Sequence, residues 1–337
     1  DTPIEVSFHV PTRILTASYR VWRSDNRGDS WTPISPDLTR SQERVEMPIM
    51  GRVQSWDAAW DVGAMSNYNT VTSIGESPLD ENLIYAGTDD GLFWVTEDGG
   101  ENWRRIEAGE MANVPNLAFV NDVKADHHDP NTVYVALDNH KSGDFSPYLV
   151  KSTDRGSTWT SIAGDIPDRH LVWRLVQDHV DPDLLFAATE FGVFFTVNGG
   201  AAWTELPGAP TISFRDIVIQ REREDVVAAS FGRGIFVLDD YTPLREGADG
   251  LAGEAQLFDT RPALWYQPKE IQYGQGADQW TADNPPFGAV FTYWLRDSHE
   301  SLEDERKDRE SDIPEGQDVP FPGWDALEAE MREQGPT

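Results

Sequence analysis

Short runs of apolar residues recur along the first 245 residues and alternate with turns rich in Asp, Pro, Asn and Gly. β-Branched and aromatic residues dominate these runs, as in the stretches 83–88 (LIYAGT), 132–137 (TVYVAL) and 184–189 (LLFAAT). Apolar residues at helical spacing are nearly absent before residue 300, whereas these residue types favour strands. The pattern therefore predicts an all-β chain over most of its length.

The predicted strands follow one order that repeats at intervals of roughly 40 to 50 residues. Each repeat has a short first strand, a tight turn, a β-branched second strand, a glycine-containing hairpin, a third strand and a polar loop into a fourth strand. Residues 38–69 form an insertion that lengthens the first interval. Several strands per repeat at this period are typical of β-propeller blades, and the sequence holds five such repeats.

One polar loop recurs four times where a third strand turns into a fourth, with the pattern Ser/Thr-x-Asp/Asn-x-Gly-x-x-Trp. The Asp or Asn side chain can accept hydrogen bonds from N–H groups of its own turn, and Gly supplies a positive φ. Asn replaces Asp in two copies, which keeps the acceptor and loses the charge, so we predict a structural role in which Trp packs between sheets. A calcium loop is the alternative, but it lacks the distal Glu ligand. The predicted structural residues are Asn26, Trp31, Asp98, Trp103, Asp154, Trp159, Asn198 and Trp203.

These loops resemble the Asp-box, or BNR repeat, of sialidases, xyloglucanase-type glycosidases, photosystem assembly factors and sortilin-type receptor ectodomains. Three longer stretches, 23–40, 86–103 and 229–245, resemble a group of large bacterial exported proteins described as sortilin-like or as "glycosyl hydrolase, BNR repeat". The resemblance covers roughly residues 1–270 and implies a β-propeller. The Asp-box is specific for fold and weakly informative about function.

The repeats, the resemblance and the composition divide the chain into three predicted parts. Residues 1–245 form the propeller portion with five blade repeats, and residues 246–297 form an exit segment and the first strands of a β-sandwich-like domain. Residues 298–337 form an acidic tail that is largely disordered or short-helical, with a helix expected in GWDALEAEMREQ. In the resembling group, further blades precede this portion and a C-terminal domain follows it, so we expect a C-terminal fragment of a longer protein.

Charge narrows the classes of partner. The formal net charge is −32, with 59 acidic against 27 basic residues, so nucleic acid and anionic lipid surfaces are unfavourable partners. Lysine is scarce, with five residues against 22 arginines, which suggests a halophilic source or, alternatively, an acidic protein of a GC-rich genome. The chain has no cysteine, and no apolar run reaches the length of roughly 18 residues that a membrane span needs. It also lacks a recognisable signal segment, as expected for a mature form or a fragment.

Ligands of propellers usually bind at the mouth of the central channel, near the innermost strands. Aligning the repeats places Ser73, Asp122, Arg174 and Asp216 in one slot of successive first strands, and Thr72, Asn121, Trp173 and Arg215 in the slot before it. Equivalent slots form a ring around the axis. Such a ring is polar enough to bind a sugar or a peptide, and its alternative is a hydrated channel with internal ion pairs. The predicted ligand-binding residues of the ring are Ser73, Asn121, Trp173, Arg174 and Arg215.

Glycoside hydrolysis needs two carboxylates about 5–10 Å apart, and Asp122 and Asp216 are the candidates, although they lie two blades apart. No Arg-Ile-Pro segment is present, which disfavours a sialidase. The insertion 41–70 holds Trp56 and Trp60, which are candidates for stacking on sugar rings or, alternatively, for packing the loop onto the propeller. A second insertion, 138–148, interrupts the hairpin of the third repeat, where it reaches a partner or only lengthens the rim.

Metal and cofactor sites are not expected. His127 and His128 are adjacent, so on a strand they would point to opposite faces and seldom share a metal. The motif Asp-His-x-Asp-Pro recurs at 178–182, which favours turn chemistry. No zinc-protease, nucleophile-elbow, phosphate-loop or complete dinucleotide motif is present.

Three functions are compatible with these features. The favoured one is an exported, non-catalytic binding or scaffold module for a protein, peptide or glycan ligand near the channel mouth, in an extracellular, periplasmic or cell-surface location. The alternative is a glycoside hydrolase that acts on a polysaccharide through Asp122 and Asp216. The third is a purely structural part of a larger surface protein. Fold resemblance supports all three and does not choose between them.

Overall fold

The computed structural model describes residues 2–48, 52–55, 57, 68–247, 253–263, 265–267, 287–297 and 301–333. The chain divides into two compact units, Asp1–Gly247 and Ala248–Thr337. The predicted loop residues Trp56 and Trp60 lie outside the described residues.

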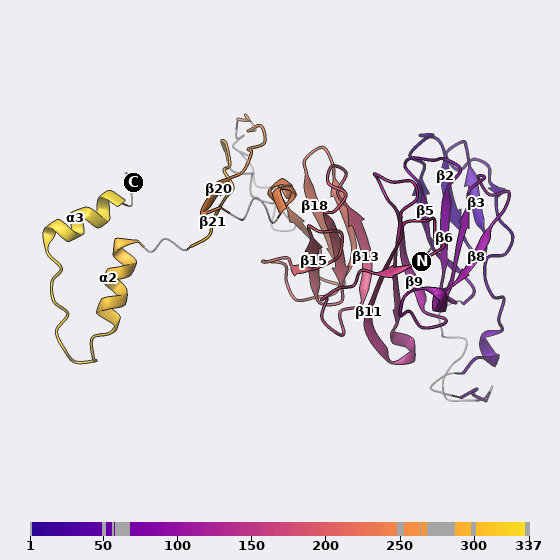
Figure 1. Ribbon diagram of the computed structural model, residues 1–337, viewed down its shortest axis with the longest axis horizontal. Helices are drawn as coiled ribbons and strands as arrows, with labels where there is room; N and C mark the ends of the chain where they lie inside the picture. Colours follow the sequence, from indigo (N-terminus) through magenta and orange to yellow (C-terminus); the bar gives the residue numbers. More distant parts are fainter. Residues whose placement is uncertain are drawn as a thin grey trace, which may run out of the picture. The chain divides into compact units, whose positions relative to one another are not determined.

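The first unit consists of five antiparallel sheets, each built from strands that follow one another in the chain (Figure 1). Four sheets have four strands and the fifth has three. The strands are β1 (Ile4–Val6), β2 (Ile14–Ala17), β3 (Val21–Ser24), β4 (Thr32–Pro33), β5 (Val71–Glu76), β6 (Ile84–Thr88), β7 (Leu92–Thr96), β8 (Arg104–Glu107), β9 (Phe119–Ala125), β10 (Val133–Asn139), β11 (Asp144–Ser152), β12 (Thr160–Ser161), β13 (Val172–Gln177), β14 (Leu185–Thr189), β15 (Gly192–Thr196), β16 (Thr204–Glu205), β17 (Phe214–Gln220), β18 (Asp225–Ser230) and β19 (Ile235–Leu238).

These sheets are the blades of a five-blade β-propeller, which confirms the predicted fold class. The first strand of each blade packs against the first strand of the next, so β5, β9, β13 and β17 follow one another around the axis, with β1 beside β5. The predicted insertion 138–148 is the hairpin between β10 and β11, with a short 3-10 turn at His140–Ser142.

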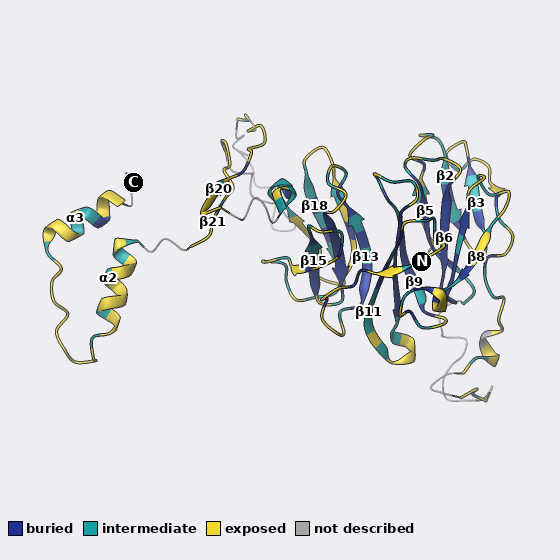
Figure 2. Cartoon of the chain, in the orientation of Figure 1, coloured by how far each residue is buried: buried dark blue, intermediate teal, exposed yellow. Residues whose placement is uncertain are grey.

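The core lies between blades. Each of four buried apolar clusters joins two successive blades, and their strands are dark blue in Figure 2 where the residues are buried. Strand β6 shows how period-2 alternation produces this arrangement, because Ile84 and Ala86 face the first blade while Tyr85 faces the third. Burial of one Ile or Leu side chain contributes about 1.5–3 kcal/mol, so the apolar clusters between neighbouring blades stabilise the propeller.

The four polar loops share one hydrogen-bond pattern. In the third blade, the Oγ of Ser152 accepts a bond from the Gly156 N–H (2.8 Å), and Asp154 Oδ1 accepts one from the Thr158 N–H (2.7 Å). The same two bonds recur in the other loops, at Ser24 and Asn26, Thr96 and Asp98, and Thr196 and Asn198. The glycine has a positive φ in each copy, from 83° to 105°. A side-chain oxygen, whether from Asp or Asn, therefore closes every loop.

The loop tryptophans reach the preceding blade. Trp103 Nε1 donates to the Ile34 carbonyl oxygen (2.9 Å), and Trp203 Nε1 donates to that of Ile162 (2.8 Å). The ring of Trp159 packs edge-to-face on Phe93, with ring centroids 5.2 Å apart. Trp31 belongs to the first blade and is 41% exposed. The motif is thus a joint between blades as well as a turn.

The second unit contains an antiparallel pair, β20 (Ala255–Leu257) with β21 (Tyr293–Leu295), and two helices, α2 (Leu302–Ser311) and α3 (Trp324–Glu333). Ser301 caps α2 by accepting a bond from the Asp304 N–H, and Arg306 of α2 pairs with Glu330 of α3 (2.8 Å). The assignment of residues 246–297 to a β-sandwich-like domain stays a prediction. In the described part of the chain, the helices are too short and too polar to cross a bilayer.

Candidate functional site

A β-bulge occupies the same place in four successive first strands. The registers pair Ser73 with Gly87, Asp122 with Ala136, Arg174 with Ala188, and Asp216 with Ala229. In each strand the residue before this pair is skipped, and the skipped residues are Thr72, Asn121, Trp173 and Arg215. These are the two slots that the repeat alignment predicts. An extra residue in a bulge is left out of the ladder and re-aims its side chain, here toward the neighbouring blade and the axis.

In the second and third blades, the skipped residues bind the next blade. Thr72 Oγ1 donates to the Val120 carbonyl oxygen (2.6 Å), and Asn121 Nδ2 donates to that of Val172 (3.0 Å). Both acceptors lie just before the bulge of the following blade, so the two bonds are equivalent.

The residues after the skipped position also bind the next blade, but as acceptors: their side-chain oxygens accept hydrogen bonds from its backbone N–H groups. Ser73 Oγ accepts from the Val123 N–H (2.9 Å), and Asp122 Oδ2 accepts from the Leu175 N–H (2.9 Å). Asp122 is 3% exposed, and its other oxygen lies 3.5 Å from Lys124 Nζ. Ser73 and Asp122 therefore stabilise the joints between blades.

In the fourth and fifth blades, the side chains of Arg174, Arg215 and Asp216 stay partly or largely exposed, whereas Trp173 is buried. The guanidinium carbon of Arg215 lies 3.7 Å from the ring centroid of Trp173. Trp173 Nε1 donates to Glu190 Oε2 (3.0 Å), which also accepts from Ser213 Oγ (2.9 Å). Glu190 thereby fixes the indole on which the guanidinium stacks.

A cavity of about 460 Å³ lies at the end of the channel where the bulges of the first strands are, and we call it the mouth pocket. Four of the predicted ligand-binding residues line it, namely Asn121, Trp173, Arg174 and Arg215. The other lining residues are Thr72, Phe119, Asp138, His140, Lys141 and Phe231. Ser73, Asp122 and Asp216 are not among its lining residues. Asp216 is 64% exposed, with Oδ1 3.9 Å from Arg174 Nε.

His140, Lys141 and Asp138 come from the hairpin insertion of the third blade and were not predicted as site residues. Asp138 is buried and accepts a short hydrogen bond from His140 Nδ1, while the His140 ring lies 5.9 Å from Trp173, edge to face. The insertion thus contributes three lining residues to the mouth pocket, which sequence spacing could not reveal because the other lining residues come from different blades.

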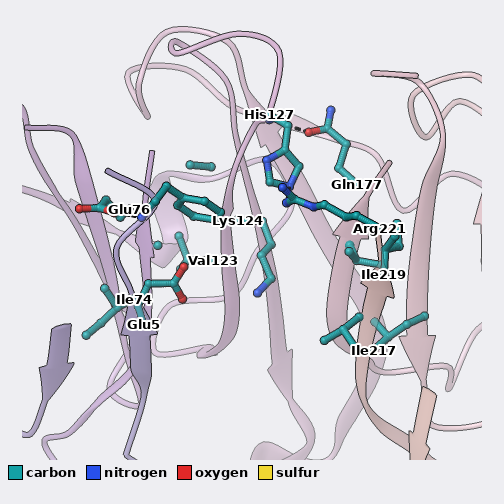
Figure 3. Close-up of a pocket in the computed structure, with 15 residues that line it drawn as sticks. Glu5, Ile74, Glu76, Val123, Lys124, His127, Gln177, Ile217, Ile219 and Arg221 are labelled. Atoms are coloured by element: carbon teal, nitrogen blue, oxygen red, sulfur yellow. Dashed lines mark hydrogen bonds between the residues drawn. The ribbon is translucent and has the colours of Figure 1, made fainter. Parts of the chain in front are cut away.

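A second pocket of about 190 Å³ is lined by the later residues of the same first strands, so it lies toward the other end of the channel (Figure 3). Figure 3 shows Glu5 and Lys124 pointing into it, with His127 beside Arg221. Burial raises the pKa of Glu5 to about 7. Burial, and then the positive charge of Arg221, lower the pKa of His127 to about 4, and Arg221 Nη2 lies 3.1 Å from His127 Nε2.

A group of metal-ligand type occurs at Asp178, His179 and Glu224, whose ligand atoms lie within 4.8 Å of one another. Arg245 already bridges the two carboxylates, with Nη2 2.8 Å from Asp178 and 2.6 Å from Glu224. Tyr241 donates a further bond of 2.5 Å to Asp178. Because a cation and a hydroxyl fill the carboxylates' coordination positions, this cluster is an internal ion-pair network that joins residues 241–245 to the fourth and fifth blades.

No family model matches the chain. The sequence is 26% identical over 223 residues to a probable oligoxyloglucan-reducing end-specific xyloglucanase of Neosartorya fischeri. This match covers 62% of this chain and 27% of that protein. It is 28% identical over 141 residues to a xyloglucanase of Paenibacillus sp., covering 39% of this chain and 14% of that protein. The chain therefore spans 27% or less of the length of these curated relatives.

Among solved structures, an ancestral GH74 enzyme matches 65% of this chain and 26% of its own, with 18% identity and a TM-score of 0.47. A GH74 enzyme of Niastella koreensis matches 71% of this chain and 30% of its own, with 17% identity and a TM-score of 0.46.

Proposed function

We propose that this chain is a glycan-binding β-propeller portion of an exported, polysaccharide-acting glycoside hydrolase. The observation that carries the proposal is that the curated relatives are described as xyloglucanases. The similarity to xyloglucanases favours the glycoside hydrolase, predicted from the sequence as the alternative, over the non-catalytic module predicted first. The four polar loops would then be Asp-box hairpins that serve the fold and not the chemistry.

The mouth pocket suits a glycan ligand. Phe231 offers an aromatic face that is 73% exposed, and it lies in the same pocket as Trp173, whose buried ring carries the Arg215 guanidinium. Asn121 and Arg174 supply polar groups beside them. Aromatic faces with a few placed polar groups are the usual composition of a small-molecule site, and sugar rings carry both an apolar face and hydroxyl groups.

The catalytic assignment of Asp122 and Asp216 stays a prediction. Asp216 has the exposure that a reacting carboxylate needs, whereas Asp122 is buried and hydrogen-bonded to the backbone of the next blade. This difference is the specific observation that favours a second candidate function, a glycan-binding module that does not itself cleave.

Affinity electrophoresis in gels that contain xyloglucan or other polysaccharides tests binding. We expect the parent chain to be retarded and Phe231→Ala to migrate freely, while Trp265→Ala, an exposed tryptophan of the second unit, behaves as the parent. Reducing-sugar release from the same panel, at low and at molar salt, tests cleavage. Release that Asp216→Asn abolishes would assign hydrolysis to this chain, and retardation without release would assign the module. A folded chain that none of the polysaccharides retards would contradict the proposal.

A further inference from the structure

Positive charge gathers in the mouth pocket of a strongly acidic protein. Three cationic residues line the pocket, namely Lys141, Arg174 and Arg215. The lining holds one carboxylate, Asp138, which is already hydrogen-bonded to His140. The whole chain has a net charge of −32, so this concentration of cations departs from the rest of the sequence. A cleft lined by one sign of charge attracts ligands of the other sign.

Among the described residues, both guanidinium groups make only long ion pairs. Arg215 lies 3.9 Å from Glu190, and Arg174 Nε lies 3.9 Å from Asp216, both longer than a charge-assisted hydrogen bond of about 2.7–2.9 Å. Arg174 donates through Nη1 to the carbonyl oxygens of Asn121 and Trp173, which leaves Nε and Nη2 without hydrogen bonds among the described residues. The partners of Arg215 among the described residues are the rings of Trp173 and Phe231 and the distant carboxylate of Glu190.

Stacking holds the Arg215 guanidinium in place. Its carbon atom lies 3.7 Å from the Trp173 ring centroid and 5.5 Å from that of Phe231, and Glu190 fixes the indole beneath it. Lys141 Nζ lies 4.8 Å from the Phe119 ring centroid in the same pocket. Cations held over aromatic faces keep their N–H groups free for an anion, and the planar fork of arginine matches a carboxylate with two hydrogen bonds.

We infer that the mouth pocket selects an acidic glycan, one whose sugar units carry carboxylates, as uronic acids do. The sugar ring lies on the exposed Phe231 face, and the carboxylate accepts hydrogen bonds from Arg215 and Arg174, with Lys141 adding charge. This inference rests on the proposed function, since it names the substrate class of the same pocket. It differs from the neutral glycan that the relatives' names indicate.

Binding of the full chain to three probes tests the inference: polygalacturonate, dextran sulfate and xyloglucan, each titrated at low and at high salt by calorimetry. We expect polygalacturonate to bind more tightly than xyloglucan, with an affinity that falls as salt rises. Arg215→Gln should weaken polygalacturonate binding by about tenfold or more, as for one lost charge-assisted pair. Arg215→Lys should recover only part of the loss, because it keeps the charge without the fork. Arg332→Gln, an exposed arginine of the second unit, is the matched control, and far-UV circular dichroism verifies that each variant is folded.

The other outcomes separate the two proposals. Equal affinity for dextran sulfate and polygalacturonate would overturn the selection of carboxylates and leave a general polyanion site. Xyloglucan binding that matches polygalacturonate binding and is indifferent to Arg215→Gln would overturn the inference while the proposed glycan function stands. Failure of the folded chain to bind either polygalacturonate or xyloglucan would overturn both.

Discussion

The indole Nε1 of Trp203 donates a 2.8 Å hydrogen bond to the carbonyl oxygen of Ile162, which belongs to the preceding blade. Trp203 is 6% exposed and sits in the apolar cluster that joins the third and fourth blades. The corresponding ring of the first blade, Trp31, is 41% exposed. The same sequence motif therefore stabilises the chain by different amounts, depending on whether another blade covers it.

This difference predicts unequal costs of truncation. Trp203→Ala should lower the free energy of unfolding by about 3–5 kcal/mol, since it opens a cavity and removes a hydrogen bond. Trp31→Ala should cost about 1 kcal/mol or less, as for most exposed positions. Urea unfolding of the two variants beside the parent measures both values. Equal losses would contradict the role of Trp203 as a joint between blades.

In the polar loops, the side-chain oxygen that accepts the N–H bonds should contribute more to stability than the negative charge of Asp. Asp154→Ala removes an oxygen that accepts from the N–H groups of Ser157 and Thr158, so we expect a loss of about 1 kcal/mol. Asp154→Asn should stay close to the parent, because Asn26 and Asn198 accept equivalent bonds in their own loops. Thermal unfolding of the two variants compares them, and a large loss in Asp154→Asn would show that the charge itself is required.

Much of the propeller could be predicted from the sequence because its signals are local. Alternating strands, turn residues and the loop motif lie within each repeat, so the blade order and the bulge slot of Trp173 and Arg215 follow from alignment of the repeats. The roles within that slot could not be predicted in this way. Whether Asp122 faces solvent or the Leu175 N–H depends on how neighbouring blades meet, and Glu5 and Lys124 share a pocket only after the ring assembles.

Asp122 should contribute to stability. Asp122→Ala leaves the Leu175 N–H without its acceptor between two blades, and a buried, unsatisfied donor costs about 1–3 kcal/mol. Asp216→Ala should change the free energy of unfolding by less than about 0.5 kcal/mol, because its side chain is exposed. Urea unfolding of both variants tests the contrast. A loss of cleavage in Asp122→Asn without a loss of stability would instead support a catalytic role for Asp122.

Glu5 and His127 should oppose each other in the pH dependence of stability. The pKa of Glu5 is raised in the folded chain to about 7, so its stabilising contribution is full below about pH 4.5 and is lost as pH rises to 7. The pKa of His127 is lowered to about 4, so its contribution is present above about pH 6.5 and is lost as pH falls to 4.

Single variants should separate these two effects. Relative to the parent, Glu5→Gln should make stability rise more steeply with pH between pH 4.5 and 6.5, and His127→Gln should make it fall more steeply. Urea midpoints at several pH values, taken as differences from the parent so that the other carboxylates cancel, measure both slopes. Parallel curves for the parent and Glu5→Gln would contradict a raised pKa at Glu5.

Arg245 should stabilise the end of the first unit strongly. Asp178 is fully buried, and its pKa is lowered to about 2 despite that burial by bonds from Arg245 and Tyr241. Removal of one partner of a buried pair typically costs about 3–5 kcal/mol, so Arg245→Ala should lower the thermal midpoint strongly at pH 7.

The same variant leaves Asp178, His179 and Glu224 close together without a cation between them. We therefore expect Zn²⁺ to raise the midpoint of Arg245→Ala while leaving that of the parent unchanged, since an ion that binds only the folded state stabilises it. A Zn²⁺-dependent rise in the parent itself would show that Arg245 does not block the cluster, and a thermal midpoint in Arg245→Ala equal to that of the parent would contradict its structural role.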